Sequence, residues 1–288
     1  MQDNLNSKYK SIVDFLQMSS EIYFNETGIK VKIEIVNDFS FNARVSKIEE
    51  KVYKIEIRHG CLCLENLIEN ITNRYTEDDL KSFWRFRKLN IFEKNAGDTY
   101  REELNQLFGS IILLHIFFHE CGHITAKYID KENGTYAEMQ PSDNGGYEKQ
   151  EQEMVADWLS TKFLYKSMFF ATIGTDKIDF EELLSILEQL TILYWLSLTI
   201  EFQIFDSVHT GDVPDYSLLT HPHPAVRLYY SLDAMQECIL DIFNIYGFDD
   251  MQAEYGVEYI VNNIYILIES YLQITETPIS IKKDDPQI

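Results

Sequence analysis

Two histidines and a glutamate lie close together inside the most hydrophobic stretch of the chain, SIILLHIFFHECGHITAKY, residues 110–128. His119, Glu120 and His123 form the pattern HExxH. On a helix, residues four apart lie on one face, so both imidazoles can bind one metal ion. Glu120 lies to the side of that face and can take a proton from a water that the metal activates. The pattern predicts a helix that carries the hydrolytic chemistry of zinc.

A catalytic zinc site also needs a third protein ligand, and it leaves its fourth position open to water. The stretch YEKQEQEMVADWLS, residues 147–160, places Glu153 and Asp157 one helical turn apart. We predict that Glu153 completes the ligand set and that Asp157 accepts the outer N–H of a ligand histidine. The alternative is that Glu153 belongs to a solvated acidic face with Glu148 and Glu151. Glu151 itself is the weaker candidate for a ligand, because it lies on a different side of the helix from Asp157.

Small residues would allow these two helices to approach each other closely. Gly122 follows the first ligand pair and Ala156 precedes Asp157. The segment 131–146, rich in Gly, Asn, Asp and Pro, is a suitable loop to reverse the chain between the helices. His115 lies one turn before His119, and we expect it to be a packed histidine rather than a further ligand.

A third stretch, THPHPAVRLYY at residues 220–230, alternates two histidines with two prolines before an arginine. Proline favours the first turn of a helix, so a helix is expected to begin here. We predict that His221, in preference to His223, donates a hydrogen bond to the oxyanion of a tetrahedral intermediate. Arg227 would orient either the site or the substrate. The alternative is an ordinary helix N-terminus that carries incidental histidines.

The elements that must position these residues follow from hydrophobic periodicity. Residues 29–37 and 51–59 alternate apolar and charged side chains and predict two half-buried strands. Helical periodicity predicts helices near residues 5–24, 62–75, 77–94, 99–129, 147–170, 178–207, 223–246 and 250–274. Thr99 and Glu102 resemble a capping box at the start of the helix that carries HExxH. The expected fold is α+β and predominantly α-helical, with a small N-terminal β-sheet.

We expect one compact unit in three parts: an N-terminal α/β region at 1–98, a helical core at 99–275 and a flexible polar tail at 276–288. The net charge of −22 disfavours binding to nucleic acid and to anionic lipid. The four cysteines form no CxxC pair, and the N-terminus lacks the apolar core of a signal peptide. The longest uninterrupted apolar runs are shorter than the roughly 18 residues of a spanning helix. A cytoplasmic location without a membrane partner is therefore expected.

The three motifs HECGH, EMVAD and HPHPAVR together resemble the gluzincin metallopeptidases, in particular the group that includes HtpX and the CAAX prenyl proteases. The pattern of that group is HExxH, then ExxAD, then HPxxxxR, and the resemblance covers roughly residues 110 to 230. It implies a zincin-like pair of active-site helices and a zinc endopeptidase. It also implies Zn²⁺ bound by His119, His123 and Glu153, with Glu120 as general base. One departure is that HtpX and the prenyl proteases are integral membrane enzymes.

In its length, its lack of a spanning segment and its doubled HPHP, the chain looks more like the Lit-type phage-exclusion peptidases. That resemblance implies a soluble bacterial enzyme that cleaves elongation factor Tu when an activating phage capsid peptide is present. The expected function is thus a soluble zinc-dependent endopeptidase that hydrolyses peptide bonds of a specific protein substrate. Two alternatives remain open. One is a regulatory metallopeptidase that cleaves a repressor, and the other is a non-catalytic interaction protein whose helices are stapled by zinc.

Overall fold

The computed structural model describes residues 2–64, 67–69, 100–127, 135–137, 147–173, 178–209 and 222–275. In these parts of the chain, long helices dominate and one small sheet accompanies them, so the predicted α-helical α+β fold is confirmed. The elements in chain order are α1 (Gln2–Thr27), β1 (Lys30–Val36), β2 (Ala43–Glu49), β3 (Val52–Arg58), the 3₁₀ turn η1 (His59–Leu62), α4 (Tyr100–Thr125), β4 (Thr135–Ala137), α6 (Tyr147–Ile173), α7 (Phe180–His209), α8 (Pro224–Ile245) and α9 (Asp250–Thr275).

The sheet has the strand order β1-β3-β2-β4. β2 and β3 form an antiparallel pair, β1 is parallel to β3, and β4 is antiparallel to β2. The strictly alternating β1 and β3 confirm the two strands predicted from sequence. Val31, Val45 and Ile55 are buried, whereas Lys30, Lys32 and Arg44 are partly or fully exposed; Glu56 of β3 is a buried exception. The sheet therefore presents one apolar face to the helices.

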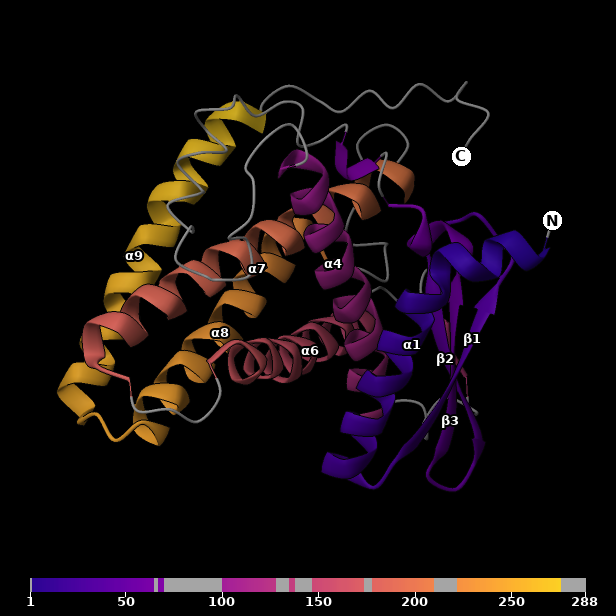
Figure 1. The fold of residues 1–288 in the computed structure, drawn as a ribbon, viewed down its shortest axis with the longest axis horizontal. Helices are drawn as coiled ribbons and strands as arrows, with labels where there is room; N and C mark the ends of the chain where they lie inside the picture. The colour runs from indigo at the N-terminus through magenta and orange to yellow at the C-terminus, as the bar shows by residue number, and fades with distance from the viewer. Residues whose placement is uncertain are drawn as a thin grey trace.

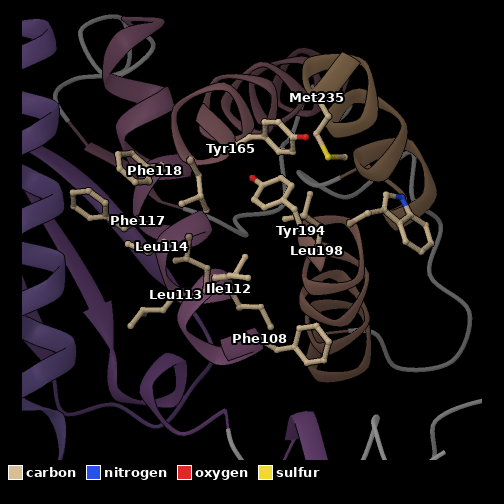
Figure 2. Packing of buried hydrophobic residues seen from close by; sticks show 14 of the residues in the cluster. Phe108, Ile112, Leu113, Leu114, Phe117, Phe118, Tyr165, Tyr194, Leu198 and Met235 are labelled. Carbon is tan, nitrogen blue, oxygen red and sulfur yellow. The ribbon is translucent and has the colours of Figure 1, made fainter. Parts of the chain in front are cut away.

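Helix α4 lies between α1 and the sheet on one side and α6, α7, α8 and α9 on the other (Figure 1). It contacts α1, β2 and β3 on one side and α6 and α7 on the other. Figure 2 shows side chains of α4, among them Phe108, Ile112 and Phe117, together with Tyr165 of α6 and Tyr194 of α7 in one buried cluster. Because the sheet and the neighbouring helices surround α4, its side chains are apolar on nearly every face.

A tyrosine of the N-terminal helix anchors the end of α4 that carries the HExxH motif. The hydroxyl of Tyr23 contacts the Thr125 hydroxyl at 2.8 Å and the Cys121 carbonyl oxygen at 3.2 Å. Burial raises the pKa of Tyr23 well above its ordinary value, so the phenol stays neutral and keeps its hydrogen. The N-terminal region thus fixes the last turns of the motif helix from outside.

The structure adds two strands that periodicity did not predict. β2 was missed, and β4 lies inside the segment 131–146 that was predicted to be a loop throughout. The helix predicted at 77–94 lies outside the described residues, and so does most of the helix predicted at 62–75. Of the latter, residues 67–69 are helical, whereas Leu62 ends the 3₁₀ turn η1 and residues 63–64 are not helical. The proposed capping residue Thr99 and the tail at 276–288 also lie outside the described residues.

Two helical stretches, Leu104–Thr125 and Phe180–Phe205, are long and apolar enough to cross a membrane by length and composition alone. The expectation from sequence had counted only uninterrupted apolar runs and therefore missed them. Within these stretches, 83% and 78% of the respective apolar windows are buried inside the protein. A buried core helix has the same length and composition, so these stretches are weak evidence for a membrane. The expectation of no membrane stays a prediction.

Candidate metal centre

The candidate site lies where α4 crosses α6, and the crossing is unusually close. A Cβ atom added to Gly122 would lie 2.8 Å from the carbonyl oxygen and 2.9 Å from the Cα atom of Ala156. Both of these neighbours are backbone atoms, which cannot rotate away. The absence of a side chain at Gly122 is therefore what lets the two helix backbones touch, as the pair of small residues predicted.

The crossing brings His119, His123 and Glu153 together, and their potential ligand atoms all lie within 4.8 Å of one another. The Nε2 atoms of the two histidines are 3.1 Å apart. The Glu153 carboxylate lies 3.1 Å from His119 Nε2 through one oxygen and 3.5 Å from His123 Nε2 through the other. All three side chains are buried.

These distances fit a small tetrahedral cation. Ligand atoms about 2.0–2.1 Å from a central zinc ion lie about 3.3 Å from one another in a tetrahedron. The separation of 3.1 Å between the two Nε2 atoms is close to that value, and so is the 3.1 Å from Glu153 Oε2 to His119 Nε2; the other oxygen, Oε1, lies 3.5 Å from His123 Nε2. Two imidazole nitrogens and one carboxylate are also the donor set of many catalytic zinc sites. The residues present therefore fit the zinc ion that the sequence motif implies.

Asp157 fixes the orientation of His119, as predicted. Its carboxylate oxygen lies 2.7 Å from His119 Nδ1. A carboxylate can only accept, so Nδ1–H of His119 is the donor. The lone pair of the neutral ring is then on Nε2, the atom that faces His123 and Glu153. Asp157 thus selects the tautomer that a metal ligand needs.

Arg227 of α8 makes a two-pronged contact with Asp157. Its Nε donates to one carboxylate oxygen at 2.6 Å and its Nη2 to the other at 2.7 Å. The guanidinium also lies over the ring of Phe202 at 4.3 Å, and its side chain is buried. Of the two roles predicted for Arg227, these contacts favour orientation of the site over contact with substrate.

Opposite charges outweigh burial at this pair. Burial alone would raise the pKa of Asp157, but Arg227 and then His119 hold it below its ordinary value. Burial alone would lower the pKa of His119, but Asp157 and then Glu153 raise it well above its ordinary value. The carboxylates of Asp157 and Glu153 therefore make the electrostatic potential negative where the ligand atoms converge, which favours a bound positive charge there.

Glu120 and His115 are both fully buried on α4. His115 does not join the ligand group; its Nδ1 lies 3.0 Å from a carboxylate oxygen of Glu201 on α7. Its carbonyl oxygen accepts a hydrogen bond from Ser160 of α6 at 2.9 Å. This agrees with the prediction of a packed histidine. The partner Glu201 was missed, although a single acid inside the apolar run LYWLSLTIEFQIF was a usable signal.

The third motif is only partly described. His221 lies outside the described residues, so its predicted hydrogen bond to an oxyanion stays a prediction. His223 is exposed and caps α8, since its Nδ1 accepts a hydrogen bond from the Ala225 N–H at 3.1 Å. Pro224 is the first residue of that helix, as the motif predicted. For His223 the structure therefore agrees with the alternative of an ordinary helix N-terminus.

Comparison with known proteins adds no assignment, because no protein-family model, curated protein or solved structure matches the chain. The site is consequently interpreted from its own chemistry.

Proposed function

We propose that the protein is a zinc-dependent endopeptidase that acts on a specific protein substrate. The observation that supports this most is the convergence of His119, His123 and Glu153, with separations that suit a tetrahedral zinc ion. The adjacent Glu120 supplies a carboxylate that a purely structural site would not need.

Each residue has a defined part in this proposal. His119, His123 and Glu153 hold the ion, which when bound lowers the pKa of a water toward about 7 and polarises the scissile carbonyl. Glu120 accepts a proton from the attacking water and then delivers it to the leaving amine. Asp157 keeps His119 in the ligating tautomer, and Arg227 holds Asp157 in place.

One observation favours a second candidate, a non-catalytic module in which zinc only staples α4 to α6. Glu120, His123 and Glu153 are each 0% exposed, and His119 is 2% exposed. A substrate must reach the ligand atoms of an enzyme, whereas a structural site has no such need. The peptidase proposal therefore requires that the site opens to admit a peptide.

Glu120→Gln separates the two candidates. The amide keeps the size of the side chain but cannot accept a proton, so the peptidase should lose activity by about 10²-fold or more while zinc stays bound. Glu151→Gln is the matched control, because it removes the same charge from an exposed position of α6. If Glu120→Gln and Glu151→Gln retain equal activity against a substrate that the wild type cleaves, the peptidase mechanism is wrong.

The ligand set is tested by measuring bound zinc in His119→Ala and Glu153→Ala. Each variant removes one of the three donors, so each should bind zinc more weakly than wild type by about tenfold or more. Wild-type affinity in Glu153→Ala would mean that the third ligand has been misassigned.

The substrate can be sought by incubating the protein with a bacterial lysate, with and without a chelator, and mapping new chain ends. The resemblance to phage-exclusion peptidases makes elongation factor Tu the first protein to inspect, with and without a phage capsid peptide. A chelator-sensitive cut in a repressor instead would support the regulatory peptidase. The same incubation with Glu120→Gln distinguishes cleavage by this protein from cleavage by contaminants.

A further inference from the structure

The outer surface of the last helix pair carries a groove that the metal centre does not use. α8 and α9 are neighbours in the fold, and the groove between them has a volume of about 490 Å³. α9 lies at the side of the molecule opposite the sheet (Figure 1). The groove is lined by Asp233, Gln236, Glu237, Leu240, Glu254, Val257, Glu258, Val261 and Asn262.

The lining residues form one stripe along each helix. On α8 they recur at helical spacing, and Val226, Tyr229 and Tyr230 extend the same stripe toward the start of the helix. On α9 the stripe continues from Val261 to Tyr265. All four of these added side chains except Tyr230, at 38%, are at least 40% exposed. Large apolar side chains therefore lie on the same helix faces beyond the groove and are exposed to solvent.

The charged residues that line the groove are all acidic. None of the lining residues that the structure describes is Lys or Arg. Glu237 pairs with Lys162 of α6 at 2.8 Å, so its charge is partly compensated. Asp233, Glu254 and Glu258 are exposed along the two walls. A groove lined by apolar side chains together with acidic side chains from both helices is complementary to an apolar stripe flanked by basic residues.

We propose that this groove binds an amphipathic helix of a protein partner, with Lys or Arg on both sides of an apolar stripe. Two antiparallel helices with apolar positions at helical spacing form the kind of groove in which such a helix lies. The stripe on α8 that contains the groove runs from Val226 to Leu240 and is about 21 Å long, the length of about 14 helical residues. A second copy of this chain is a poor occupant, because each copy carries a net charge of −22. The inference does not depend on the metal centre.

The test uses the full-length protein and a labelled peptide of about 14 residues made of Leu and Lys at helical spacing. Binding is followed by fluorescence anisotropy at about 0.15 M salt, and helix formation by circular dichroism. The double variant Glu254→Lys/Glu258→Lys should bind the peptide about tenfold more weakly than wild type. Glu49→Lys/Glu50→Lys is the matched control, since it changes the net charge equally at two exposed positions at the end of β2 and in the turn that follows it.

Each outcome decides the proposal. A loss confined to the groove variant, together with a helical signal on binding, supports it. Equal losses in both double variants would show only general attraction to an acidic protein and would overturn it, as would no binding by the wild type. A further variant, Tyr229→Ser/Tyr265→Ser, should weaken binding about threefold or more because it removes apolar contact area. If that variant instead converts a wild-type dimer to a monomer in sedimentation, the groove is an interface between copies and the proposal is wrong.

Discussion

Gly122→Ala should destabilise the protein and weaken binding of zinc at the proposed site, although alanine favours a helix more than glycine does. The new Cβ atom would lie 2.9 Å from the Cα atom of Ala156. Carbon atoms pack at about 3.5 Å or more, so α4 and α6 must separate by about 0.6 Å. Overpacking of this kind costs up to about 3 kcal/mol, and the helix preference returns about 1 kcal/mol. We expect a net loss of about 2 kcal/mol in the free energy of unfolding.

The same separation should weaken zinc binding, because ligand distances in a metal site hold to within about 0.2 Å. Gly109→Ala on the same helix is the matched control. Among the described residues, its Cβ atom would meet only the side chain of Ile68, at an ordinary 3.5 Å. We expect that control to gain about 0.5–1 kcal/mol and to keep its zinc affinity. Urea unfolding of the metal-free proteins and competition with a chromophoric chelator measure both quantities. If the two variants unfold alike and bind zinc alike, the close crossing of α4 and α6 does not govern the site.

Two further predictions concern the pair behind the ligands. Arg227→Met leaves the buried Asp157 carboxylate without its guanidinium partner, so it should lower the free energy of unfolding in urea by about 3–5 kcal/mol. Adding Asp157→Leu to the same chain should restore part of that loss. A loss below about 1 kcal/mol in the single variant would contradict the contact. In the metal-free protein the pKa of Asp157 is lower than in the unfolded chain, where it is about 3.9. Its stabilising contribution is therefore complete above about pH 4 and disappears as the pH falls toward the lowered folded value. The difference in unfolding free energy between wild type and Asp157→Asn should shrink over that acid range, and a constant difference would count against the pairing.

Sequence periodicity was sufficient to predict the strands in which every second residue is apolar. β1 and β3 alternate cleanly, and their ends were predicted within one residue. β2 was missed because its pairing with β3 shifts register between Lys47 and Glu49, which interrupts the alternation. β4 has only three residues, and it exists because β2 offers an edge to pair with. A strand that short has no periodicity of its own.

In the candidate site, too, some contacts could be predicted from sequence spacing and others could not. His119 and His123, like Glu153 and Asp157, are placed by the turn of a single helix, so their spacing in the sequence was enough to predict shared faces. The contact between Arg227 and Asp157 depends on how α8 packs against α6, which no local pattern encodes. The pairing of His115 with Glu201 likewise depends on the packing of α7 against α4.

The Asp157–Arg227 contact also has a consequence for the order of events during synthesis. A ribosome completes His119, His123 and Glu153 before it reaches Arg227, so the proposed metal ligands exist in a chain in which Asp157 still lacks its arginine partner. Until α8 packs against α6, Asp157 lacks the two hydrogen bonds from Arg227 that hold its carboxylate beside His119. Firm metal binding would then be a late event that reports completion of the C-terminal helices, and a chain truncated within α7 would carry every ligand and still bind the ion loosely.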